Sequence, residues 1–130
     1  MADFVASTRN TMLDWLTGLT TPAAVATRYI TVFNGDPQGA GSEVINTITG
    51  SANRQDMTTA MAAAAAGSAA SDTDITFTNS AVGAATVDYV AVYSAITGGT
   101  LLASTQVTSK SVSVGDSLKI LSGQLTFAIT

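Results

Sequence analysis

The strongest constraint on the fold is an alternation of apolar and polar residues with a period of two, which begins after Asp74 and continues to the end of the sequence. Successive side chains of a β-strand point to opposite faces, so this period is typical of strands that bury one face. Turn-forming segments with glycine, such as Thr97-Gly98-Gly99-Thr100, separate several of the runs and favour hairpins. The recurring apolar residues are Ile75, Phe77, Val87, Tyr89, Ala91, Tyr93, Leu101, Ala103, Val107, Val112, Val114, Leu118, Ile120, Leu125, Phe127 and Ile129.

The run at residues 87–94 is apolar on both faces. Tyr89 and Tyr93 lie on one face of the predicted strand, and Val90 and Val92 lie on the other. A strand that buries both faces is typical of the centre of a sheet or of a subunit interface. We therefore expect a central or interface strand, in which Val90 and Val92 are candidate contacts between subunits.

An earlier strand is predicted at residues 29–33, because β-branched and aromatic residues dominate that run. It stops at Asn34-Gly35-Asp36-Pro37, whose composition is typical of a turn. Residues 38–50 contain several Gly and Ser residues and are expected to form a loop.

The N-terminal segment follows a helical period instead. We predict an amphipathic helix between residues 3 and 19 that ends near Gly18, because glycine is common just after the last helical turn. Trp15, the only Trp, is expected to pack in the core of its own domain, and contact with a neighbouring subunit is the alternative. The large apolar residues of this segment are Phe4, Val5, Met12, Leu13, Trp15, Leu16 and Leu19.

Residues 58–71 are of low complexity and rich in alanine. The alanines at 62–66 favour helix in isolation, but Gly67 and the shortness of the run oppose a stable helix. We expect an extended or irregular segment, with a single helical turn as the alternative. Small side chains allow close backbone approach, so Ala62 and Ala64 are further candidate contacts between subunits.

These patterns predict a mainly β fold, an antiparallel jelly-roll-like β-sandwich with an N-terminal amphipathic helix. A chain of 130 residues fits one domain. We expect a single domain over residues 1–130, with residues 1–20 as a helical arm and residues 27–130 as the sandwich. Because the sequence has no Cys, its stability must come from packing and assembly.

Charged residues make up 11% of the chain, against about 25% in an ordinary soluble domain. Ala, Ser and Thr replace them, which suggests a surface largely covered by neighbouring subunits. A neutral, well-hydrated Ser/Thr surface is the alternative.

The same composition disfavours two classes of partner. A net charge of −4 argues against nucleic acid, whose phosphates bind clustered Lys and Arg. The longest apolar stretch, residues 60–66, is too short to span a membrane, and the N-terminus lacks the pattern of a signal peptide.

Catalytic and metal chemistry has few candidates in this sequence. His and Cys are absent, which excludes Ser-His-Asp and Cys-His nucleophiles and imidazole or thiolate zinc sites. Four carboxylates could form a glycosidase pair or, at residues 72–74, contribute to a calcium site, but solvated acids and a turn that caps its own backbone are the better interpretation. We expect no enzyme, no cofactor and no metal; the four carboxylates are Glu43, Asp72, Asp74 and Asp88.

The second half carries a set of hairpin and core patterns: Ala91-Val92-Tyr93-Ser94-Ala95, Thr97-Gly98-Gly99, Leu101-Leu102, Val114-Gly115-Asp116-Ser117-Leu118 and Gly123-Gln124-Leu125-Thr126-Phe127. With the N-terminal helix, the strand at 29–33 and Asn53-Arg54-Gln55-Asp56-Met57-Thr58, the chain resembles short structural proteins of tailed bacteriophages, of the capsid fibre or tail fibre (head decoration) type. The likeness covers most of the chain and departs at residues 60–70, which are shorter and more polar in the family. The resemblance implies a jelly-roll-like sandwich that forms a homotrimer on the outside of a phage particle, and it brings no catalytic or binding residues.

We expect a capsid decoration or cement protein that binds the major capsid protein on the outer surface of the head and stabilises the shell. The reason is that the chain is one small domain with few charges, whereas a receptor-binding fibre normally carries a shaft or anchoring domain beside its head. A tail fibre or receptor-binding module that contacts host glycans is the alternative, and a carbohydrate-processing enzyme is a third hypothesis. The N-terminal helix with Phe4, Trp15 and Leu16 is the candidate attachment arm, and the subunit interface is expected at Val90 and Val92 or in the Ala-rich segment.

Overall fold

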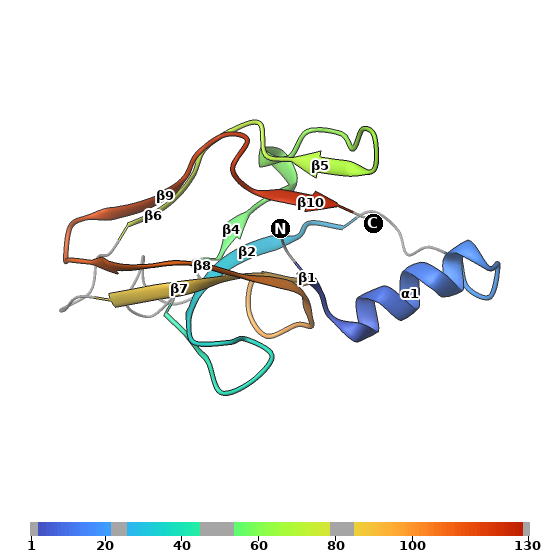
Figure 1. The fold of residues 1–130 in the computed structure, drawn as a ribbon, viewed down its shortest axis with the longest axis horizontal. Helices are drawn as coiled ribbons and strands as arrows, with labels where there is room; N and C mark the ends of the chain where they lie inside the picture. The colour runs from blue at the N-terminus through green and yellow to red at the C-terminus, as the bar shows by residue number, and fades with distance from the viewer. Residues whose placement is uncertain (1–2, 22–25, 45–53, 79–84, 129–130) are drawn as a thin grey trace.

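The computed structural model describes residues 3–21, 26–44, 54–78 and 85–128, in which one antiparallel sheet faces two short ribbons (Figure 1). The six-stranded sheet has the order β1-β8-β7-β2-β3, and β4 pairs with the first residues of β2. Its strands are β1 (Asp3–Phe4), β2 (Tyr29–Asn34), β3 (Ser42–Glu43), β4 (Gln55–Asp56), β7 (Ala85–Tyr93) and β8 (Leu101–Val112).

The second layer consists of two antiparallel ribbons. One pairs β6 (Ile75–Thr78) with β9 (Ser117–Ile120), and the other pairs β5 (Ser68–Ala70) with β10 (Thr126–Ala128). The helix α1 (Ala6–Leu16) follows β1, and the 3₁₀ turn η1 (Thr58–Ala60) follows β4. The expectation of a mainly β, antiparallel fold with one N-terminal helix is therefore confirmed.

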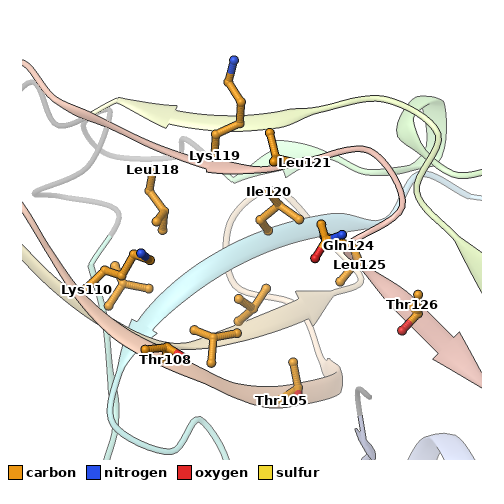
Figure 2. A pocket seen from close by; sticks show the side chains of 13 residues that line it. Thr105, Thr108, Lys110, Leu118, Lys119, Ile120, Leu121, Gln124, Leu125 and Thr126 are labelled. Atoms are coloured by element: carbon orange, nitrogen blue, oxygen red, sulfur yellow. The ribbon is translucent and has the colours of Figure 1, made fainter.

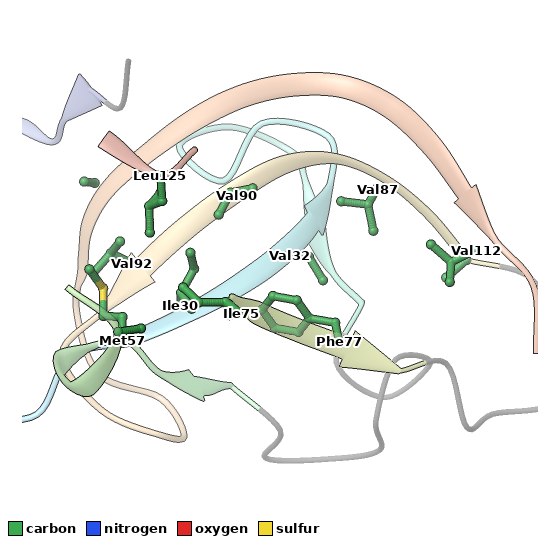
Figure 3. Packing of buried hydrophobic residues seen from close by; sticks show 13 residues of the cluster. Ile30, Val32, Met57, Ile75, Phe77, Val87, Val90, Val92, Val112 and Leu125 are labelled. Atoms are coloured by element: carbon green, nitrogen blue, oxygen red, sulfur yellow. The ribbon is translucent and has the colours of Figure 1, made fainter. Parts of the chain in front are cut away.

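The hydrophobic core lies between the sheet and the ribbons (Figure 3). The central strands β2 and β7 contribute Ile30, Val32 and Val92, which face Ile75 and Phe77 of β6. The alternation of Ile75 and Phe77 with exposed Thr76 follows from the period of two, because one face of β6 is buried and the other is wet. Burial of such side chains is the main stabilising contribution in a chain without disulfides.

A register shift in β7 changes which residues face this core. Val87 pairs with Lys110 but Tyr89 pairs with Gln106, so β8 has extra residues opposite Asp88. The faces of β7 change at this irregularity, since Val87 lies on the core side before it and Val90 and Val92 lie on the core side after it. All three side chains are almost completely buried.

The prediction of a central strand at 87–94 is confirmed, since β7 lies between β2 and β8. Val90 and Val92 are buried in the core of their own chain, and their role as contacts between subunits stays a prediction. Regular alternation would have put them opposite Val87, and the bulge breaks that alternation.

The other face of the sheet is covered by the loop that joins β2 and β3 (Figure 1). Gln38 of this loop donates its side-chain amide to the Ser104 hydroxyl of β8 at 3.0 Å. The two ends of the loop approach so closely that only glycine fits at position 41. A Cβ there would stand 2.4 Å from the Gly35 carbonyl oxygen. The turn predicted at residues 34–37 therefore lies within a longer structure that also buries the second face.

Arg54, just before β4, binds two other segments of the chain through one guanidinium group. It donates two bonds to the Glu43 carboxylate of β3, at 2.8 and 3.0 Å. A third nitrogen donates to the carbonyls of Ala95 and Gly98 in the loop between β7 and β8, at 2.8 and 2.7 Å. The Arg54 side chain is 5% exposed and that of Glu43 17%, so hydrogen bonds within the chain satisfy most of both charges.

The same guanidinium lies over an aromatic ring. Its Cζ atom is 3.9 Å from the Tyr93 ring centroid, and Tyr93 in turn stacks on Phe33 with centroids 6.2 Å apart. Burial raises the pKa of the Tyr93 hydroxyl above its ordinary value; the Glu43 charge adds to this rise and the Arg54 charge opposes it. The stack holds the loop after β7 against the sheet.

Replacement of Arg54 is expected to be costly. Arg54→Met would leave the Glu43 carboxylate buried without its partner, and the free energy of unfolding should fall by about 3–5 kcal/mol. Lys119→Met is the matched control, since the Lys119–Asp74 pair spans 3.7 Å between side chains 49% and 44% exposed; its loss should cost less than about 1 kcal/mol. Urea unfolding of both variants measures the difference, and equal small losses would contradict the structural role of Arg54.

The Ala-rich segment combines both predicted conformations. It begins with the turn η1 and then extends into a hairpin whose tip has positive φ at Ala66 (52°) and Gly67 (77°). Two consecutive residues of positive φ match the two-residue hairpin turn that follows the twist of the strands. The expected extended segment is confirmed for most of its length. Residues 45–50 of the predicted loop, and Asn53 and Ile129, lie outside the described residues.

Candidate functional site

Among the described residues, the hydrogen bonds that join helix α1 to the sheet lie in its first turns. β1 pairs with β8, the Val5 amide donates to the Leu102 carbonyl at 3.0 Å, and the Thr8 hydroxyl donates to the same carbonyl at 2.9 Å. Beyond Thr8 the helix extends away from the β-strands (Figure 1). The sheet therefore fixes where the helix starts, and its C-terminal half projects.

The end of α1 is defined by hydrogen bonds that satisfy its last carbonyls. The Gly18 amide donates to the Trp15 carbonyl at 3.1 Å, and the Leu19 amide donates to the Asp14 carbonyl at 2.8 Å. Together with φ of +80° at Gly18, this pair is a Schellman motif. The predicted end near Gly18 is confirmed. The helix starts later than expected, at Ala6, because residues 3–4 pair as a strand.

The projecting part of α1 exposes large apolar side chains. No residue of the helix is buried. The exposed fractions are 57% for Leu13, 56% for Trp15, 73% for Leu16 and 76% for Leu19, and we call these four residues the apolar arm. The prediction that Trp15 packs in its own core is wrong. The core between the sheet and the ribbons does not include Trp15, and its indole is exposed on the helix.

A groove opens on the other side of the molecule, between β8 and β9 (Figure 2). It has a volume of about 390 Å³. The groove lies where the second layer is only a narrow ribbon, so part of the core face of β8 is left open. Its residues are Val87, Val90, Thr105, Val107, Thr108, Lys110, Leu118, Lys119, Ile120, Leu121, Gln124, Leu125 and Thr126.

Charge differs between the groove and the arm. Two cations, Lys110 and Lys119, line the groove, and no carboxylate is among its described lining residues. The last turn of α1 contains Asp14 and no basic residue. A helix also carries a partial negative charge at its C-terminal end. Lys119 points away from the groove (Figure 2) and pairs with Asp74 at 3.7 Å. Lys110 is therefore the cation that the groove offers to the negative tip of the arm.

A family model, described as Podophage GP4 fiber I protein gp80, matches residues 3–128. The chain belongs to this family. No curated protein matches the chain. As a member of the gp80 family, it is a fibre-type structural protein of a phage, associated with the virion. This agrees with the phage resemblance at the level of a structural fibre protein.

The other predicted contact residues fall in different environments in this gp80-family chain. Phe4 lies in β1 rather than on the helix, is partly buried, and packs 6.2 Å from the Phe127 ring, so its place in a helical arm is corrected. Leu16 is on the arm. Ala62 and Ala64 are exposed on the Ala-rich hairpin, and their role as contacts stays a prediction.

The candidate carboxylates serve as acceptors for the chain itself. Glu43 is held in the ion pair described above. Asp88 accepts from an amide of the β2–β3 loop at 2.7 Å, and Asp74 accepts from the Ser122 amide at 2.8 Å rather than from its own turn. Asp72 is exposed. In the described ranges, no group of three or more metal-binding side chains gathers, and no helix is long and apolar enough to cross a membrane.

The groove was not found from the sequence, because its walls come from strands that alternate like any others. Val107 and Leu118 look like ordinary core positions when each strand is read alone. The signal that could have suggested it is the shortness of the runs at 117–120 and 126–128, which are too short to cover a twelve-residue strand.

Trp15 makes the arm directly observable. Because it is the only Trp, intrinsic fluorescence reports on α1 alone. In dilute protein shown by sedimentation to be a single protomer, the emission should resemble that of Trp in water and be fully open to iodide quenching. On assembly it should shift to the blue and become protected. A blue, protected emission in the single protomer would contradict the projecting arm.

Proposed function

We propose that this gp80-family chain is a non-enzymatic subunit of a phage fibre, and that it assembles into the particle through the apolar arm. The observation that carries this proposal is the helix itself, which has no buried residue and exposes Trp15 and, with the turn after it, three leucines. Single exposed apolar residues are common, but a cluster on one projecting element marks a contact site.

The non-enzymatic role is supported by the chemistry of the acidic residues. The candidates Glu43, Asp74 and Asp88 are engaged as acceptors in the fold. The groove between β8 and β9 is lined by apolar, hydroxyl, amide and lysine side chains, with no carboxylate among its described residues. Acid–base hydrolysis of a glycoside needs two carboxyl groups placed on either side of one bond.

Two positions on the particle are compatible with this role. The description of the family favours a place in a fibre of a podophage, and we consider this position first. Decoration of the outer head shell, bound to the major capsid protein, is the second candidate. It is favoured by the low content of charge, which suits a surface covered by neighbours.

The experiment is to add purified chain to particles that lack it and to count bound copies. Leu16→Glu should reduce binding at least about 30-fold, because a charge replaces an apolar contact residue at the centre of the arm. Deletion of the whole N-terminal segment is a poorer test, since residues 3–4 pair with β8 and Val5 is buried.

Ile96→Glu is the matched control. Ile96 is 45% exposed on the loop after β7 and belongs neither to the arm nor to the lining of the groove. It should leave binding unchanged. Undiminished incorporation of the Leu16→Glu chain would refute the role of the arm. The location of the bound copies, on the tail or over the head, decides between the two positions.

A further inference from the structure

We propose that the apolar arm of one copy docks into the β8–β9 groove of a second copy, head to tail. This inference rests on the proposed function, in which the chain assembles through α1, and it names the partner as the chain itself. The fold of one copy leaves both the arm and the groove uncovered. In the proposed contact, the arm of one copy covers the groove of the next.

The groove has a suitable size. A cavity of about 150 Å³ lined by apolar side chains holds one benzene ring. The groove offers about 390 Å³, which is enough for the indole of Trp15 together with the Leu16 side chain. The arm of the same copy does not fill it, since α1 extends away from β9 (Figure 1).

The lining of the groove suits the large apolar side chains at the end of α1. Its inner surface includes the aliphatic side chains of Leu118, Ile120 and Leu125, and threonines stand at its edges (Figure 2). Burial of such surfaces against Trp and Leu is favourable in proportion to the apolar area removed from water.

Charge fixes the orientation of the docked helix. Asp14 and the negative end of the helix dipole lie beside Trp15 and Leu16, and Lys110 lies at the groove. Bringing the tip of the arm to the groove therefore pairs opposite charges. Arg9, the cation of the helix, lies at its other end, where it donates to the Phe4 carbonyl.

The contact uses different surfaces on the two copies. Such a head-to-tail interface closes into a ring when the rotation between copies divides a full turn, and it extends into a filament otherwise. A filament leaves one arm and one groove uncovered at its ends, whereas a ring covers both features on every copy. In either arrangement each arm lies in the groove of the next copy, and the mass of the assembled species distinguishes the two.

The test uses two variants that each damage one half of the contact. Leu16→Glu damages the arm and leaves the groove intact. Leu121→Glu damages the groove, where Leu121 is 54% exposed, and leaves the arm intact. Each variant alone should lose self-association, with a Kd raised at least about 30-fold. Equal urea midpoints would show that both still fold.

Mixing the two variants gives the decisive result. The arm of the Leu121→Glu copy should enter the groove of the Leu16→Glu copy, and the remaining arm and groove are both damaged. Light scattering should therefore show a species of twice the protomer mass of 13.1 kDa, and no larger one. Ile96→Glu should keep the wild-type mass.

Three outcomes would overturn the docking proposal. One is a Leu121→Glu chain that keeps the wild-type mass, which would mean that the groove is not used. Another is a mixture that gives no dimer. The third is a wild-type chain that stays a single protomer yet binds particles through Leu16; the arm would then dock on another virion protein, and the proposed function would stand alone. If Leu16→Glu also binds particles normally, the proposed function fails as well.

Discussion

The burial of the apolar face of β2 and β7 beneath β6 and Leu125 is the contact on which the rest of the molecule depends (Figure 3). It uses the whole of the β6–β9 ribbon and the segment before β10. Because these elements are short, they cover the centre of the sheet but only part of β8. The same packing that stabilises the protomer therefore leaves a groove beside it.

Charge is scarce in this chain, and its placement is correspondingly specific. The buried Arg54–Glu43 pair secures the loop after β7, and Asp88 and Asp74 hold backbone amides of other turns. Few charges remain to keep the exposed apolar arm dispersed in water. A protomer built in this way gains most by covering the arm, which is consistent with a subunit of a larger phage structure.

Much of the fold could be predicted from local patterns. The period of two located β6, β7 and β8, the run of β-branched and aromatic residues located β2, and Gly18 located the end of the helix. The environment of Val90 and Val92 could not be predicted, because one bulge opposite Asp88 reverses the faces of β7 and leaves no mark in the composition. Trp15 was misplaced for a related reason: the pattern shows that a helix has an apolar side but not what covers it. The groove could not be predicted from local patterns, because it depends on the relative lengths of strands that are far apart in the chain.

The most direct test of head-to-tail docking is a cryo-electron microscopy map of the particle-bound or assembled chain, at a resolution that shows the Trp15 side chain. We predict helical density in the β8–β9 groove of each subunit, continuous with β1 of its neighbour, and the indole between Val107 and Leu118. Grooves that are empty, with α1 packed against a different virion protein, would contradict this arrangement.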